Sequence, residues 1–388
     1  MFYSFTKINI EAPFPTTQCG HSCQTEKLFS YHDHLYARVA GFKSSDFWII
    51  HYSLDLLAFD RKQRDRLQAF LQDAYQDEKI RVITSTTHTH YANSVRDPQY
   101  VEYLCDLLAK QTLQMEYREI DDVTTSYQHL PSKAIGKSRI SAYEEDNETL
   151  GLIRFFTKED NFFTIIYYNC HPTILEANVP YFSAEYPGYV LNKLEEKYPG
   201  TDFTYLQGAA GDISSRFTRD GQDYEALSKL GDKLLQDIAY LYEQEAKKVP
   251  LVPQYREIPF KVVNEYTPID LSMIRSDLSE RELQTIRIGQ EMREKRQKEA
   301  NGIFSEPEDE LLISVLDLAS VQLIFFPREI FSYYMNFLDL NRQLLVSYSN
   351  GYGPYVLPPD FAYVTYEMFL DTLSNDSKKQ LIGILKNI

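Results

Sequence analysis

The sequence lacks three features that would assign it to a specialised class of protein. Its 388 residues include four cysteines, Cys19, Cys23, Cys105 and Cys170, which are too few for the disulfide framework of a secreted domain. No stretch approaches the roughly 18–20 consecutive apolar residues that a membrane-spanning helix needs. The first residues do not join a basic segment to a long apolar run, as a signal peptide does. We therefore expect a reduced, cytoplasmic protein without a transmembrane segment.

Basic residues are scarce relative to acidic ones. Forty Lys and Arg residues against 56 Asp and Glu residues give a formal net charge of −16. Because nucleic-acid binding needs a clustered basic face, this acidity argues against a nucleic-acid partner. A hydrophobic content of 43% and an aromatic content of 14% argue against disorder. The length is sufficient for a sizeable core.

Strand-like apolar segments alternate along the chain with segments of helical periodicity. Strands are predicted over 35–42, 46–57, 80–87, 162–169, 203–207, 310–320, 321–327 and 344–349. Helices are predicted over 61–76, 98–112, 187–198 and 223–247. This alternation predicts an α/β fold, with a layered sheet and helices on its faces. A charged segment at 275–300 is expected to form a solvated helical insertion. No linker divides residues 1–388, so we expect a single domain.

Polar residues follow five of these strands at the point where each strand ends. They include, in chain order, His88 and His90, His171, Asp212 and Ser214, Glu329, and Tyr352. Because ligands bind beyond the carboxyl ends of strands in α/β sheets, these groups converge if the strands share one sheet. Zinc readily takes imidazole and carboxylate ligands, and a catalytic zinc site keeps one position open for water. In extended backbone His88 and His90 point the same way, so both can face such a site.

Each of these residues also has an ordinary structural explanation. A histidine after a strand is more often a hydrogen-bonded structural residue than a ligand. Residues 208–211 can form a tight turn that needs glycine, Ser214 can cap a helix and Asp212 can serve in a turn. Tyr352 and Tyr355 are two of 30 tyrosines. The joint placement of these residues at strand ends favours a functional site over the separate explanations.

Four motifs, taken in order, resemble those of a known enzyme family. They are HTH at 88–90, NCHPT at 169–173, SAEYPGY at 183–189 and LQGAAGDIS at 206–214. This series resembles the catalytic domain of the neutral/alkaline non-lysosomal ceramidase family, most of all a broad bacterial branch. The resemblance implies a zinc-dependent amidohydrolase that cleaves an N-acyl amide and holds one Zn²⁺ per chain. The similarity runs to about residue 360, so the β-sandwich domain that follows the catalytic domain in ceramidases is not expected.

The resemblance also implies a role for each site residue. It assigns the zinc ligands to His88, His171, Glu329 and Tyr352, with Tyr355 as the alternative to Tyr352. It assigns catalytic roles to Ser214, His90 and Arg139, the last from the segment Ser138–Tyr143. It brings Asp212, Tyr355 and His21 close to the substrate. Zinc-activated water would then attack the amide, Arg139 or His90 would stabilise the oxyanion, and His90 would protonate the leaving nitrogen.

The sequence departs from the family pattern in ways that leave two alternatives open. Tyr91 and Ala92 stand where the family has small residues after HTH, and GDISSR replaces GDxSPR. One alternative is an esterase or amidase with Ser214 as nucleophile and His90 as base. The other is a non-catalytic metal- or ligand-binding relative, which Tyr91 beside the metal would favour. The expected partner is a small N-acylated amine, amino acid, sugar or lipid fragment rather than ceramide itself.

Overall fold

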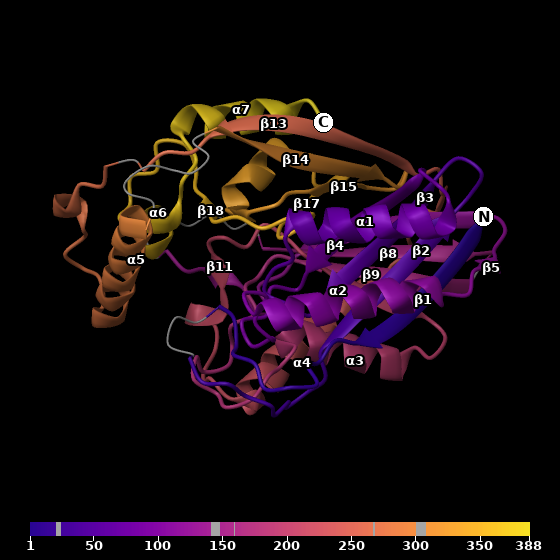
Figure 1. Ribbon diagram of the computed structural model, residues 1–388, viewed down its shortest axis with the longest axis horizontal. Helices are drawn as coiled ribbons and strands as arrows, with labels where there is room; N and C mark the ends of the chain where they lie inside the picture. The colour runs from indigo at the N-terminus through magenta and orange to yellow at the C-terminus, as the bar shows by residue number, and fades with distance from the viewer. Residues whose placement is uncertain (21–24, 141–147, 159, 267, 300–307) are drawn as a thin grey trace.

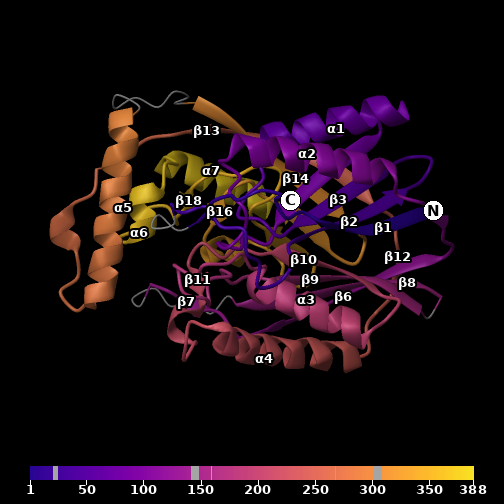
Figure 2. The same ribbon diagram turned by 60° about the horizontal axis from the view of Figure 1, so that its bottom comes forward.

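The computed structural model describes residues 1–20, 25–140, 148–158, 160–266, 268–299 and 308–388. Two five-stranded sheets stack face to face, and each carries helices on its outer side (Figures 1 and 2). A third, four-stranded sheet packs against their shared core. The predicted α/β fold with layered sheets and helices on their faces is confirmed. None of the described helices has both the length and the apolar composition that crossing a bilayer requires.

The first sheet has the strand order β4-β3-β2-β1-β5. Its strands are β1 (Phe2–Asn9), β2 (Tyr36–Lys43), β3 (Trp48–Leu54), β4 (Ile80–Thr86) and β5 (Arg118–Glu119). Only β3 and β4 run parallel among these pairs. Its outer face is covered by α1 (Arg61–Tyr75) and α2 (Pro98–Leu113). Along β3, Ile50 and Tyr52 face these helices, whereas Ile49 faces the second sheet, as the two-residue period of a strand requires.

The second sheet has the order β10-β9-β8-β6-β12. Its strands are β6 (Val123–Pro131), β8 (Thr149–Thr157), β9 (Asp160–Tyr168), β10 (Asp202–Gln207) and β12 (Val249–Pro250). The helices on its outer face are α3 (Glu185–Lys197) and α4 (Tyr224–Glu243). Leu152 faces these helices and Ile153 faces the first sheet. Because both faces of the central strands are buried, β8 and β9 are nearly continuous apolar runs.

The third sheet, with the order β13-β14-β15-β17, forms one end of the molecule together with the C-terminal helix. Its strands are β13 (Gln254–Val263), β14 (Glu308–Asp317), β15 (Gln322–Phe325) and β17 (Gln343–Val346), and α7 (Asn375–Lys386) packs against it. The smaller elements are β7 (Lys137–Ser138), β11 (Ile213–Ser214), β16 (Glu329–Ile330), β18 (Tyr355–Val356), α6 (Tyr366–Leu370) and the 3-10 helices η1 (Ser215–Phe217), η2 (Leu271–Met273) and η3 (Ser332–Phe337). Helix α5 (Glu280–Glu299) stands at the edge of the molecule beside α6 (Figure 1).

The strands that carry the predicted site residues belong to three sheets rather than one. The segment after β17 joins them. Its Ser347 amide donates to Gln207 O at the end of β10 (2.9 Å), and its Tyr348 carbonyl accepts from the Thr86 amide at the end of β4 (3.2 Å). The strand ends therefore converge through this connecting segment and not along a shared sheet edge.

Candidate active site

Four predicted side chains meet where the strand ends converge. The Nε2 atoms of His171 and His88 lie 3.3 Å and 3.5 Å from Oε2 of Glu329. The hydroxyl of Tyr352 donates to the other oxygen, Oε1, across 2.5 Å. His88, His171 and Glu329 are buried, and Tyr352 is half-buried. The structure thus brings together two imidazoles, one carboxylate and one phenol from four separate segments of the chain.

Backbone carbonyls fix the orientation of both imidazoles. Nδ1 of His88 lies 2.8 Å from Leu57 O, and Nδ1 of His171 lies 2.5 Å from Ala210 O. Because a carbonyl oxygen only accepts, each Nδ1 carries the proton in the neutral ring, and the Nε2 lone pair faces Glu329. This is the arrangement that metal-binding histidines show in proteins. His88 holds its position with a φ of +63°, a left-handed conformation that a non-glycine residue adopts only at a cost.

The electrostatics of the cluster favour a neutral His171 imidazole beside an ionised carboxylate. Burial, followed by the nearby Arg139 charge, lowers the pKa of His171 to about 4. Burial works to raise the pKa of Glu329, but His88 and His171 outweigh it and hold that pKa well below its ordinary value. Burial and the Glu329 charge raise the pKa of Tyr352, so its phenol keeps its proton and donates it to the carboxylate. Neutral nitrogen donors and a carboxylate are the ligands that zinc takes.

His90 lies against the same cluster. Its Nε2 is 3.4 Å from Nε2 of His88, and the two rings are nearly perpendicular at 87°. The ligand atoms of His88, His90 and His171 all lie within 4.8 Å of one another, so these three residues can also hold a metal ion. Gly20, with a φ of +121°, packs on the His90 ring, where an added Cβ would come within 2.7 Å of Cγ. Glycine is therefore required at this contact.

Arg139 and Asp212 support the cluster from one side. The Arg139 guanidinium donates to Gly211 O (2.6 Å) and pairs with Oε1 of Glu367 (2.8 Å). The Asp212 carboxylate accepts from the amide (2.7 Å) and the hydroxyl (2.8 Å) of Ser332, just beyond Glu329. Burial raises the pKa of Asp212 to about 6. Through these two hydrogen bonds Asp212 holds the segment that carries Glu329 in place.

The two tyrosines that the sequence leaves open have different partners. Tyr352 contacts the Glu329 carboxylate. Tyr355 lies on β18, where it pairs in register with Glu329 on β16, and its ring packs under the Arg139 guanidinium with 5.4 Å between Cζ and the ring centroid. Tyr352 is therefore the phenol that faces the cluster. His21, the third residue expected near the substrate, lies outside the described residues.

The positions of Ser214 and Tyr91 bear on the two alternative functions, a serine nucleophile and a non-catalytic binding protein. The Ser214 hydroxyl accepts from the Arg216 amide (3.4 Å) and caps η1. Within the described ranges no hydrogen bond joins this hydroxyl to an imidazole, which a serine–histidine nucleophile pair needs. The Tyr91 ring belongs to the core between the second sheet and its helices, and its hydroxyl donates to Leu175 O (2.5 Å). The Tyr91 side chain thus packs into the core of the protein.

Two further residues of the site were not predicted from the sequence. The Tyr348 ring stacks on His88, with 3.8 Å between centroids and 20° between planes. Glu185, in the SAEYPGY motif, is buried with a φ of +57° and accepts from the amides of Ile174, Leu175 and Tyr186. It thereby holds the loop that follows His171. A carboxylate among apolar neighbours in a motif was the available signal for Glu185, whereas one tyrosine among 30 gave none for Tyr348.

Comparisons with known proteins agree with the fold. The structure is similar to that of neutral ceramidase from Pseudomonas aeruginosa, with a TM-score of 0.76 and 13% sequence identity over 99% of this chain and 73% of that one. A ceramidase complexed with C2 gives a TM-score of 0.74 at 13% identity, over 99% of this chain and 74% of that one. No family model and no curated sequence matches. The resemblance expected from the four motifs is thus confirmed at the level of the fold, along nearly the whole chain.

Proposed function

We propose that the protein is a zinc-dependent hydrolase that cleaves an N-acyl amide. The observation that carries the proposal is the orientation of His88 and His171, each held through Nδ1 by a backbone carbonyl with Nε2 facing Glu329. The ceramidase-like fold supports it, since proteins with this fold include a neutral ceramidase. We assign the metal to His88, His171, Glu329 and Tyr352, because imidazoles and a carboxylate are ligands that zinc takes.

The residues around the metal set would supply the remaining chemistry. Zinc bound there would act as a Lewis acid and would generate a hydroxide nucleophile near neutral pH. His90, beside His88, is placed to give a proton to the leaving nitrogen. The Arg139 charge lies near the carboxylate cluster and would stabilise negative charge that develops on the amide oxygen. Ser214, bridged through the backbone to His171, would help to position the substrate.

The proposal is tested by metal content and by turnover. Purified protein should contain about one zinc per chain by inductively coupled plasma mass spectrometry, before or after reconstitution. A panel of N-acyl amines, amino acids, sugars and lipid fragments, with detection of the freed amine, should reveal a substrate whose cleavage stops on chelation and returns with zinc. Absence of metal after reconstitution, or turnover of esters alone, would contradict the proposal. Activity that resists chelators and disappears in Ser214→Ala would favour the serine mechanism.

A further inference from the structure

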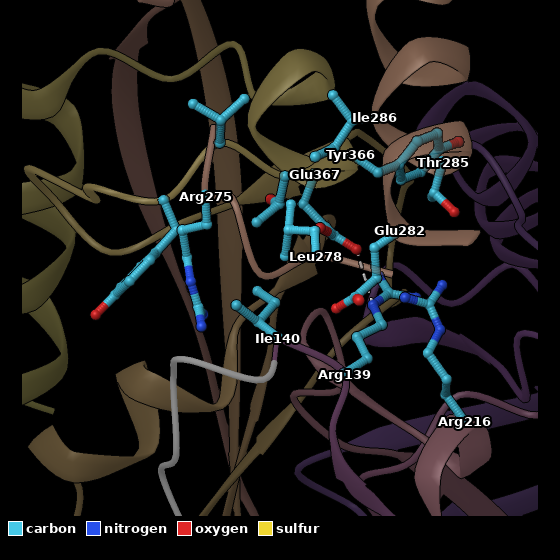
Figure 3. Close-up of a pocket in the computed structure, with 13 residues that line it drawn as sticks. Arg139, Ile140, Arg216, Arg275, Leu278, Glu282, Thr285, Ile286, Tyr366 and Glu367 are labelled. Carbon is cyan, nitrogen blue, oxygen red and sulfur yellow. Dashed lines mark ion pairs between the residues drawn. The ribbon is translucent and has the colours of Figure 1, made fainter. Parts of the chain in front are cut away.

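A pocket adjoins the cluster of proposed zinc ligands on the side of Arg139. Its walls come from the Arg139–Ile140 segment, from Arg216 on η1, from α5 with the turn before it, and from the segment that opens α6. Figure 3 shows Arg139 and Arg216 rising from the same side toward Glu282 and Glu367. Because Arg139 lines this pocket and its charge also acts on His171 and Tyr355, the pocket and the cluster share a wall.

Among the described residues, the charged groups of the pocket other than Arg216 have an ion-pair or hydrogen-bond partner. Arg139 pairs with Glu367 (2.8 Å) and Arg275 with Asp277. The Glu282 carboxylate accepts from the amide and the hydroxyl of Ser279 (2.8 Å and 2.6 Å). These contacts all join groups within the protein.

Arg216 is the exception. In the described part of the chain its guanidinium has neither a hydrogen bond nor an ion pair within 4.0 Å. Burial, followed by repulsion from Arg139, lowers the pKa of Arg216, although attraction to Glu367 and Glu282 opposes this shift. A half-buried guanidinium has five donors to satisfy, and its planar fork matches carboxylate and phosphate groups. In a protein of net charge −16, a guanidinium with free donors can bind the anionic group of a ligand at this one position.

Apolar side chains complete the lining. Ile140, Leu278, Ile286 and Val364 face the pocket, and Ile286 belongs to a small buried cluster that joins α5 to α6. The charged helix expected at 275–300 therefore contributes a wall of this pocket in addition to its exposed face. A pocket with an apolar lining and one unpaired guanidinium fits a molecule with an apolar part and an oxyanion.

We propose that this pocket binds the substrate through an anionic group that pairs with Arg216. The substrate class is then an N-acyl compound that carries a carboxylate or another oxyanion, such as an N-acyl amino acid, in preference to an uncharged amide. This inference rests on the proposed function for the identity of the bond that is cleaved. Binding of the anion itself depends only on the pocket.

The first experiment measures binding without hydrolysis. Isothermal titration calorimetry on the full chain would compare 1-octanesulfonate with uncharged 1-octanol, neither of which contains an amide. The sulfonate should bind at least about tenfold more tightly, as expected for a charge-assisted hydrogen bond. Arg216→Gln should abolish this preference, and Arg216→Lys should retain part of it. Arg287→Gln removes the same charge from an α5 side chain that is 68% exposed, and it should leave the preference unchanged.

Each outcome decides the proposal. Equal affinity for both probes, no binding of either probe, or a preference that survives Arg216→Gln in a variant that unfolds like the parent would overturn it. Octyl phosphate that binds far more tightly than octanesulfonate, again through Arg216, would assign the oxyanion as a phosphate.

The second experiment measures turnover of N-octanoylglycine and of its uncharged counterpart N-octanoylglycinamide. Arg216→Gln should raise KM at least about tenfold for the first, change kcat little, and leave both parameters unchanged for the second. A loss that is equal for the two substrates would assign Arg216 a structural role. Anion binding without hydrolysis of any amide would reject the proposed function and keep the anion site, so the two failures can be told apart.

Discussion

Tyr352 donates a hydrogen bond to Oε1 of Glu329 across 2.5 Å, while Oε2 of the same carboxylate faces the Nε2 atoms of His171 and His88. One carboxylate thus links all the proposed zinc ligands. Because it lies on the two-residue strand β16, its position depends on the pairing of β16 with β18 and on the bonds between Asp212 and Ser332.

Glu329→Gln is expected to lower the zinc content from about one per chain to less than about half. The amide has the shape of the carboxylate but lacks its charge. Glu102→Gln is the matched control, because Glu102 is 60% exposed and lies on the outer helix α2. Metal analysis of both variants after dialysis against equal free zinc is the measurement. Full zinc content in Glu329→Gln would remove Glu329 from the metal set.

The histidine variants distinguish the two metal sets that the geometry allows. His171→Ala should lose zinc, whereas His90→Ala should keep it and lose about 10²- to 10⁴-fold in kcat, as expected for the loss of a general acid. His34→Ala, with a side chain that is 65% exposed, should change neither quantity. If His90→Ala also lacked zinc, the metal ligands would be His88, His90 and His171.

Two variants of Tyr348 distinguish the contribution of its ring, which stacks on His88, from that of its hydroxyl. Its ring stacks on the imidazole, but its buried hydroxyl has no hydrogen-bond partner among the described residues. Tyr348→Phe should therefore leave the free energy of unfolding unchanged or raise it by about 1 kcal/mol. Tyr348→Ala should lower it by about 3–5 kcal/mol and weaken zinc binding, because the cavity frees the His88 ring. Chemical denaturation and zinc titration test this. A stability loss in Tyr348→Phe would show that the hydroxyl is bonded in the folded protein.

Glu185 should make the stability of the protein depend on pH. Burial raises the pKa of its carboxyl to about 7, against an ordinary value of 4.5, although three backbone amides favour the charged form. The stability that the protonated form contributes is fully present below pH 4.5 and is lost as the pH rises through about 7.

Glu185→Gln should remove the part of the pH-dependent loss of stability that is due to the Glu185 carboxyl. Between pH 4.5 and 7, the free energy of unfolding of the variant should fall less steeply than that of the parent, by up to about 1.4 kcal/mol per pH unit. Urea denaturation at several pH values is the measurement, and Glu102→Gln again serves as control. Parallel curves for Glu185→Gln and the parent would show that Glu185 titrates alike in the folded and unfolded states.

Local patterns predicted a large part of the fold. The helices at 61–76 and 98–112 and the strands at 80–87 and 203–207 end within two residues of α1, α2, β4 and β10. In these segments the apolar period and the flanking residues agree with the final structure, as Pro98 does at the first position of α2. Strand β6, whose VTTSYQHLP sequence is largely polar, was not predicted, because pairing with β8 and β12 and not its own composition makes it a strand.

The sequence by itself determined which residue types follow each strand, and strand ends are where an α/β protein places its ligands. That was enough to place His88, His171, Glu329 and Tyr352 among the candidate residues, and the family resemblance then implied these four as the metal ligands. It did not determine that Tyr352 rather than Tyr355 faces the carboxylate or that Tyr348 stacks on His88. Nor did it determine that the Arg216 guanidinium has no hydrogen bond or ion pair among the described residues. Those facts depend on contacts between separate segments of the chain, which only the packing of three sheets around one connecting segment fixes.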